Sequence, residues 1–121
     1  MSESAEQKEI VRWFRETWPE YSKSLRVSLA GLNFGSGQRG SIMKNHVRSL
    51  GVEDSEADIL IALKRGEFGA LVLEHKKAGA KRGATDGQLE YVGYHNAVGN
   101  CACVTVGVDM AKAAIKQYME L

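Results

Sequence analysis

The sequence predicts an α/β fold, a small mixed central β-sheet flanked by helices, in the order α-β-α-β-β-α-β-α. Amphipathic helical patterns alternate with short strand patterns along the chain. Two neighbouring strands are apolar on both faces, which is typical of a central hairpin covered by helices on each side. The 121 residues are 44% hydrophobic and 26% charged, and we therefore expect one globular domain spanning residues 1–121.

The N-terminal half is predicted to contain a helix, a strand and a second helix. A capping-box pattern at Ser4 and apolar residues at spacing four predict a helix over residues 5–18, which the single proline ends. The alternating residues 25–30 predict a strand with one polar face. The glycine-dense residues 31–40 match neither common nucleotide-binding glycine motif, and Ser41 is the predicted cap of the second helix.

The C-terminal half is predicted to supply the rest of the sheet and its second layer of helices. Its elements follow in order as a strand over residues 58–63, a polar turn over 64–69, a strand over 70–76, a basic loop over 77–87, a helix over 85–98, a strand over 101–107 and a helix over 109–121.

Composition excludes several classes of protein. No apolar run reaches about 18 residues, so we expect no transmembrane helix, and the acidic, polar first residues do not resemble a signal peptide. Cys101 and Cys103 lie two apart on one predicted strand, which is a poor spacing for a disulfide and suits a reducing, cytoplasmic compartment. The net charge of +1 argues against a protein that coats DNA nonspecifically, but leaves a nucleic-acid enzyme open.

Three charged residues are predicted to meet at one end of the central hairpin. Asp58 begins one strand, while Glu74 and Lys76 end the next. In an antiparallel hairpin the start of the first strand lies beside the end of the second. Glu74 and Lys76 are two apart and therefore point to the same face.

This constellation indicates a cation site. Charges at the end of a buried strand are costly unless they are paired or bind a ligand. Asp58 and Glu74 would offer oxygen ligands to Mg²⁺ or Mn²⁺, with the backbone carbonyl of His75 as a third oxygen. Lys76 would then orient or activate an attacking water, as in phosphodiester hydrolysis. The alternative is an ordinary salt bridge at a solvated strand end.

In this order the motifs resemble the VRR-NUC family (virus-type replication-repair nucleases) of the PD-(D/E)XK nuclease superfamily, in its stand-alone phage or bacterial form. The resemblance covers nearly the whole chain and implies the restriction-endonuclease-like core of that superfamily. The residues that carry it are Glu6, Trp13, Trp18-Pro19-Glu20, Asn33, Gly35, Arg39, Leu50-Gly51-Val52, Asp58, residues 69–76 with Glu74 and Lys76, and Gln88.

One segment departs from the family pattern. The family usually has Gly-X-Pro-Asp before the metal aspartate, whereas this chain has Ser55-Glu56-Ala57-Asp58. The missing proline is not a ligand, so activity is expected to survive. Glu56 adds a negative charge nearby and becomes a second candidate for binding the metal.

The resemblance also implies roles for individual residues. Asp58 and Glu74 correspond to metal ligands and Lys76 to the catalytic lysine. Glu6 resembles the helix-borne glutamate that reaches the metal, directly or through water, with Glu9 as its competitor; the alternative is a first-turn acid that favours the positive helix end. Gln88 resembles the glutamine that holds the lysine or the water.

Basic residues near these motifs predict contacts with DNA phosphates. Lys44 and Arg48 are four apart and share a helix face. The full set of predicted DNA-binding residues is Arg39, Lys44, Arg48, Lys77, Lys81 and Arg82.

The resemblance implies a Mg²⁺- or Mn²⁺-dependent DNA endonuclease that is selective for branched DNA, especially four-way (Holliday) junctions, and acts as a homodimer. A two-fold dimer would present two matching sites to the two related cuts that a junction needs. The alternatives are a restriction-like or nonspecific duplex or flap nuclease, and a DNA-binding module with the same fold.

Overall fold

The computed structural model describes residues 2–27, 37–50 and 58–121, apart from the side chain of Val47. Predictions for residues 28–36 and 51–57, including Asn33, Gly35 and Glu56, lie outside the described residues. The described elements are α1 (Glu3–Thr17), the 3₁₀-helix η1 (Pro19–Ser24), β1 (Leu25–Val27), α2 (Gly37–Ser49), β2 (Ile59–Ile61), β3 (Leu71–Lys76), α3 (Asp86–Ala97), β4 (Cys101–Val106) and α4 (Val108–Met119).

The four strands form one mixed sheet in the order β1-β2-β3-β4. β1, β2 and β3 are antiparallel neighbours, and β4 pairs parallel with β3. Parallel neighbours need a crossover connection, which α3 supplies here. The α/β class, the mixed sheet and the predicted order of elements are therefore confirmed, with η1 as the one unpredicted helix among the described residues.

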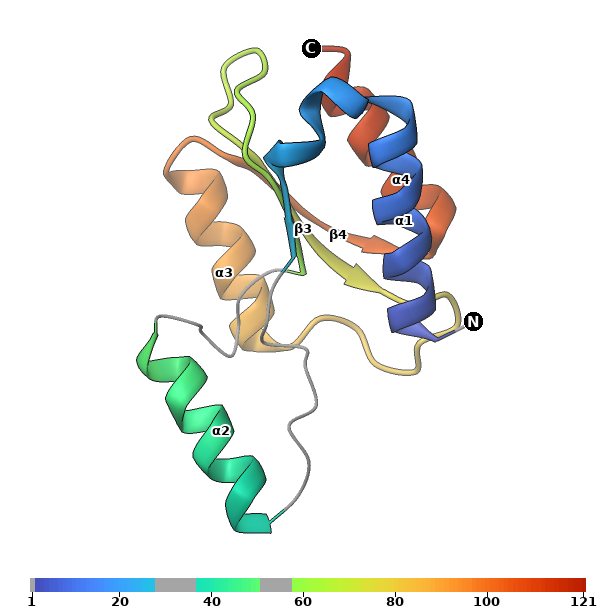
Figure 1. Ribbon diagram of the computed structural model, residues 1–121. Coiled ribbons are helices and arrows are strands. Elements are labelled where there is room, and N and C mark those ends of the chain that lie inside the picture. The colour runs from blue at the N-terminus through green and yellow to red at the C-terminus, as the bar shows by residue number, and fades with distance from the viewer. Residues whose placement is uncertain (1, 28–36, 51–57) are drawn as a thin grey trace.

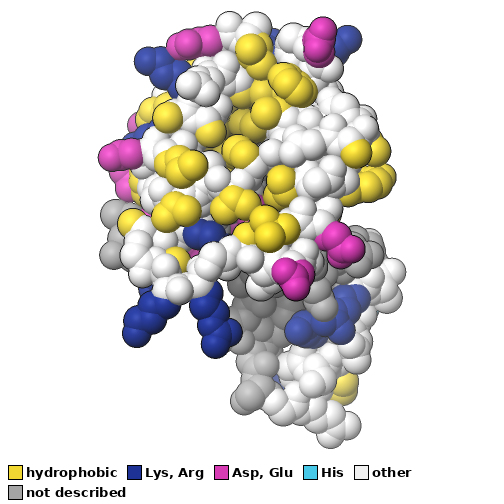
Figure 2. All heavy atoms as spheres, turned by 180° about the vertical axis from the view of Figure 1, so that it is seen from behind, with side chains coloured by type: hydrophobic (Ala, Val, Ile, Leu, Met, Phe, Trp, Pro, Cys, Tyr) yellow, Lys and Arg dark blue, Asp and Glu magenta, His cyan; other side chains and the backbone are white. Residues whose placement is uncertain are grey.

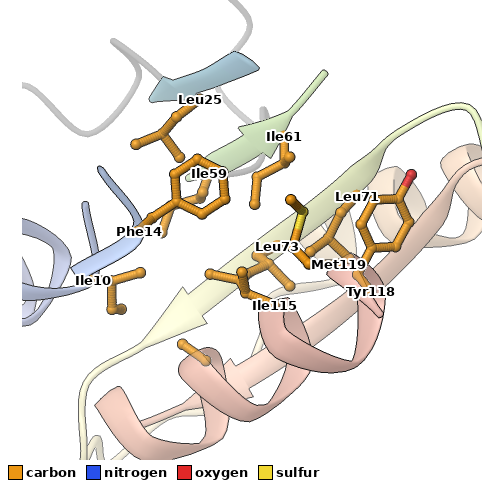
Figure 3. Close-up of a cluster of buried hydrophobic side chains, with 11 residues drawn as sticks. Ile10, Phe14, Leu25, Ile59, Ile61, Leu71, Leu73, Ile115, Tyr118 and Met119 are labelled. Atoms are coloured by element: carbon orange, nitrogen blue, oxygen red, sulfur yellow. The ribbon is translucent and has the colours of Figure 1, made fainter. Parts of the chain in front are cut away.

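The main hydrophobic core lies between the sheet and the pair α1 and α4, which run side by side on one face (Figure 1). Alternate β3 residues, Leu71 and Leu73, point to this face because side chains alternate along a strand. Figure 3 shows them packed against side chains from both helices and from β1 and β2. The buried members include Ile10, Phe14, Leu25, Ile59, Ile61, Ile115, Tyr118 and Met119.

The opposite face of the sheet is covered by α3. Val72 and Ala102 are buried there, against Leu60 of β2 and the α3 residues Tyr91 and Val92. β3 is apolar on both faces for this reason, as the sequence predicts. The two helical layers leave the C-terminal end of β3 between them, where Glu74, His75 and Lys76 follow the apolar run.

Two helix starts differ from the predictions. The cap of α1 is Ser2, whose side chain accepts a hydrogen bond from the Ala5 N–H over 3.1 Å, so the predicted cap at Ser4 is wrong. α2 begins at Gly37, so Ser41 lies inside the helix rather than at its start. A sequence often offers more than one residue that could cap a helix, and the local pattern does not determine which of them the helix uses.

α2 stands apart from the sheet and its two helical layers (Figure 1). Ile42 and Met43 on this helix are 61% and 49% exposed. Across the described residues, none of the helices has the length and apolar character needed to cross a membrane.

Candidate active site

Asp58 and Glu74 meet at one end of the sheet. Ile59 pairs with Leu73 in the antiparallel β2–β3 ladder, which places Asp58 opposite Glu74 one residue further along. The backbone N–H of His75 donates a hydrogen bond to Asp58 Oδ2 over 2.8 Å. The predicted juxtaposition of the start of one strand and the end of the next is thus present.

Glu74 is the buried carboxylate of the site, and only one of its two oxygens has a hydrogen-bond partner within the described part of the chain. Its side chain is buried, with only 1% of the residue exposed. The Gln88 side-chain amide donates to Glu74 Oε1 over 2.7 Å, and Lys76 Nζ lies 3.9 Å from the same oxygen. Glu74 Oε2 is buried and has no hydrogen-bond partner among the described residues. A buried carboxylate oxygen without a partner is costly for folding, which makes this position a candidate for binding a ligand.

The two carboxyl groups perturb each other. Burial and the neighbouring Asp58 carboxylate raise the pKa of Glu74 to about 8, against the opposing effect of the Lys76 ammonium. Burial also raises the pKa of Asp58 above its usual value, although the hydrogen bond from the His75 N–H opposes the shift. Two carboxyl groups that resist ionising side by side are stabilised in their charged form by a cation.

The donor set at this point fits a hard divalent cation. The unpartnered Glu74 oxygen and the Asp58 carboxylate are the two charged oxygens available. The N–H and C=O of one strand residue face the same neighbouring strand, so the His75 carbonyl also faces the Asp58 side. No group of three His, Cys, Asp or Glu side chains suited to a metal occurs among the described residues. Backbone and water oxygens would therefore complete the coordination, which is the usual habit of Mg²⁺.

His75 points to the opposite face, as predicted, and is buried there. Its Nε2 lies 2.8 Å from Glu6 Oε1, and its Nδ1 lies 2.9 Å from the Thr105 hydroxyl. An ionised carboxylate only accepts hydrogen bonds, so His75 Nε2 carries a hydrogen and donates it in the hydrogen bond to Glu6 Oε1. Both ring nitrogens of this buried histidine therefore have a partner.

Glu6 contacts the His75 ring and the backbone after β3, on the face of the strand opposite to Glu74. Its Oε1 contacts the His75 ring, and its Oε2 accepts a hydrogen bond from the Ala78 N–H over 3.0 Å. Burial alone would raise the pKa of Glu6, but these two hydrogen bonds, together with nearby positive charge, hold the pKa below its usual value. The structure brings Glu6 to the end of β3 yet does not bring it together with Asp58 and Glu74. Glu9 instead faces α4, where Lys112 Nζ lies 3.5 Å from its Oε1.

Gln88 reaches Glu74 rather than Lys76. It also closes a capping box at the start of α3, in which the Thr85 hydroxyl accepts from the Gln88 N–H and the Thr85 N–H donates to Gln88 Oε1. The amide oxygen is thus fixed by the helix start, which leaves the amide N–H₂ directed at the carboxylate. The local sequence signal, Thr85 followed three residues later by a glutamine, is present in the chain.

Thr105 is the buried polar residue that the sequence reasoning missed. It is fully buried on β4 and stands in register with His75 across the parallel β3–β4 pair. A threonine in an apolar strand is an ordinary strand residue, so only the register reveals its partner.

The predicted DNA-binding residues fall in two groups. Arg39, Lys44 and Arg48 are exposed on α2, whereas Lys77, Lys81 and Arg82 are exposed on the connection between β3 and α3. Figure 2 shows Lys and Arg side chains that project from the lower part of the molecule. The second group follows directly from the strand that carries Glu74 and Lys76.

Comparison with known proteins places the fold. No protein-family model matches the sequence, and no curated protein matches it at a significant level. A solved structure described as a "VRR_NUC domain protein" superposes with a TM-score of 0.81, over 100% of this chain and 90% of that chain. The chain has the VRR_NUC fold. The two sequences are 23% identical, so this likeness concerns the fold. The resemblance predicted from the motifs is confirmed at that level, and the VRR_NUC fold agrees with a PD-(D/E)XK-like core.

Proposed function

We propose that this chain is a Mg²⁺- or Mn²⁺-dependent DNA endonuclease that hydrolyses phosphodiester bonds at the end of β3. The observation that carries the proposal is the buried, unpartnered oxygen of Glu74 beside Asp58, on a strand that also presents Lys76. The shared fold supports the same proposal, because the solved structure with this fold is named for a nuclease domain.

Each residue at the site has a distinct task in this proposal. Asp58, Glu74 and the His75 carbonyl would hold the cation, which when bound supplies a Lewis acid and lowers the pKa of a water. Lys76 is 16% exposed at its side chain and can orient the attacking water and offset phosphate charge. Gln88 fixes one Glu74 oxygen and leaves the other available.

In this proposal Glu6 affects the cation site indirectly, through the backbone at the end of β3. It binds the His75 ring and the Ala78 N–H, so it holds the strand end whose backbone supplies the Asp58 contact. We therefore propose Glu6 as a positioning residue in place of the metal-ligand role that the family resemblance implies.

We propose branched DNA, such as a four-way junction, as the substrate and a homodimer as the active form. A two-fold dimer places two identical sites for two symmetric cuts, and a chain of 121 residues has little surface with which to recognise a junction alone. Basic residues on α2 and on the β3–α3 connection would contact phosphates. Two free cysteines suit a reducing, cytoplasmic compartment.

A cleavage assay with Mg²⁺ or Mn²⁺ tests the proposal. The substrates are a labelled four-way junction, a flap and a linear duplex of matched sequence, and Glu74→Ala is the control. Symmetric cuts confined to the junction and absent in the variant are the expected result. Equal cutting of all three substrates would instead indicate a general nuclease. Tight binding without any cutting would contradict hydrolysis and leave a DNA-binding module.

Sedimentation equilibrium, with and without junction DNA, tests the assembly separately. A dimer at the concentrations that support cleavage is expected. A monomer bound to the junction and cutting it would contradict the dimer while leaving the nuclease intact.

A further inference from the structure

A basic groove lies between α1 and β1, and apart from Leu25, which belongs to the hydrophobic core, it is lined by residues not discussed above. Both elements are drawn in blue in Figure 1. It has a volume of about 770 Å³. Its floor is aliphatic, with Val11, Leu25 and Val27, and its rim carries four cations and one acid. The charged residues of the rim are Lys8, Arg12, Arg15, Arg26 and Glu16.

The cations of α1 form a stripe along one side of the helix. Lys8, Arg12 and Arg15 are spaced by four and three residues, so they share a face. All three are exposed, and none has an ion-pair partner among the described residues. Like charges four residues apart, such as Lys8 and Arg12, destabilise a helix, whereas Arg15 lies in the last turn of α1, where a positive charge is favourable.

Arg26 on β1 completes the rim in a fixed orientation. Its Nη1 donates to the Lys23 and Leu25 carbonyls, over 2.5 and 2.8 Å. Both hydrogens of Nη1 are used in this way, and the remaining guanidinium donors have no partner among the described residues. An arginine held by its backbone contacts is preorganised for an anion.

The groove lies on the α1 side of the sheet, whereas the Glu74 side chain lies on the α3 side. Both lie toward the same end of the strands: Val27 pairs with Ile59, the neighbour of Asp58, so the backbone at the β1 end of the groove is about two strand spacings, or roughly 10 Å, from the backbone of Glu74. The Glu6 contact with His75 places the start of α1 at the same end of the sheet. From Lys8 to Arg15 the stripe then leads away from the site by about 10 Å.

We infer that this groove binds the phosphodiester backbone of the nucleic acid, at phosphates beyond the one that enters the active site. The charge of the rim selects a polyanion, and the stripe is extended rather than a single pocket, as a strand of successive phosphates requires. The inference rests on the proposed nuclease function for the position of the scissile phosphate, but the contact with nucleic acid is separate from hydrolysis.

The test measures the affinity for a labelled linear duplex by fluorescence anisotropy over a range of NaCl concentrations, in EDTA. The variants are Arg12→Gln and Arg12→Gln/Arg15→Gln. The control is Lys116→Gln, which removes an exposed cation from α4 outside the groove. Circular dichroism first establishes that each variant is folded.

Each groove substitution is expected to lower the slope of log Kd against log salt by about one, while Lys116→Gln leaves it unchanged. Slopes equal to that of the control would overturn the inference. A change of oligomeric state in the groove variants, with the slope unchanged, would also overturn it, because the groove would then hold a second copy of the chain.

Cleavage separates this inference from the proposed function. If the protein cuts DNA, the groove variants should raise KM several-fold and leave the single-turnover rate at saturating DNA unchanged. A reduced salt slope without cleavage by any form of the protein would support the groove and contradict hydrolysis. Normal cleavage with an unchanged salt slope and KM would support hydrolysis and contradict the groove.

Discussion

Both faces of β3 carry buried ionisable residues at the C-terminal end of the strand, but the two faces differ in whether the polar atoms of these residues have hydrogen-bond partners. On the α1 side, His75 has a partner at each ring nitrogen, and Glu6 uses both of its oxygens. On the α3 side, Glu74 is as deeply buried but leaves Oε2 without a partner. The pKa of Glu6 is held below its usual value, whereas that of Glu74 is raised to about 8.

The difference separates structure from function at a single strand end. Removing one partner of a buried charge whose hydrogen bonds are all made destabilises the fold, because the other partner is left unsatisfied. A buried charge with an open oxygen and a carboxylate neighbour destabilises the fold until a cation binds. The comparison therefore predicts that substitutions on the two faces have opposite consequences for stability and activity.

The largest expected effect is on catalysis, from the α3 face. Lys76→Ala should reduce the cleavage rate by about 10²–10⁴-fold, the range for a positioned group that assists proton transfer, while DNA binding persists. Glu74→Gln should abolish cleavage. In EDTA at pH 8 or above it should leave the free energy of unfolding equal or higher, since it removes a buried charge that the Asp58 carboxylate repels. Single-turnover cleavage and urea unfolding measure the two quantities. Equal loss of binding and cleavage in Lys76→Ala would identify Lys76 as a binding residue.

The α1 face should respond in the opposite sense. Glu6→Ala leaves His75 Nε2 and the Ala78 N–H buried without a partner, and we expect a loss of about 3 kcal/mol in the free energy of unfolding. Thr105→Val removes one neutral hydrogen bond and should cost about 1 kcal/mol. Urea unfolding checks both. A Glu6→Ala variant of wild-type stability would contradict the assignment of Glu6 to the fold.

Most of this contrast between the faces follows from local rules, and part of it does not. The geometry of an antiparallel hairpin predicts that Asp58 lies beside Glu74. The alternation of side chains along β3 predicts that the His75 ring points to the other face. The partner of His75 was out of reach because Glu6 lies 69 residues away in the chain, and no local pattern encodes such a contact. The basic stripe of α1 was likewise unremarkable until β1 closed the other side of the groove.

Cap positions were the least predictable local feature. The chain offers Ser2 and Ser4 at the start of α1, and the choice depends on the docking of Glu6 and Ile10 against the sheet. Tertiary packing selects among helix starts that the sequence leaves nearly equivalent.

The pH dependence of stability should show the two glutamates separately. Glu74 binds its proton more tightly in the folded state, so without metal the free energy of unfolding should fall as pH rises from about 4.5 to about 8. Glu6 binds its proton less tightly in the folded state, so its stabilisation should be lost as pH falls below about 4.5.

Urea unfolding in EDTA at several pH values checks these slopes. In Glu74→Gln the decline toward pH 8 should become shallower, with a remainder from Asp58, whose pKa is also raised. In Glu6→Gln the loss of stability in acid should shrink. An alkaline decline that is the same in Glu74→Gln and the wild type would contradict the high pKa of Glu74.

The smallest expected effect concerns Gln88, which serves both the helix start and the site. Gln88→Ala removes the capping box and the contact with Glu74, whereas Thr85→Ala removes only the capping box. Both should cost about 1 kcal/mol of stability, and only Gln88→Ala should lower the cleavage rate at saturating metal. Equal rates in the two variants would limit Gln88 to the fold.

The most direct test of the account is calorimetric titration of Mn²⁺ into the metal-free protein at pH 8. The α3 face is predicted to bind the cation with release of protons, because Glu74 has a pKa of about 8. Glu74→Gln should lose this binding, and Glu6→Gln, the matched change on the other face, should retain it. Binding that survives Glu74→Gln, or that is lost only in Glu6→Gln, would contradict the central claim.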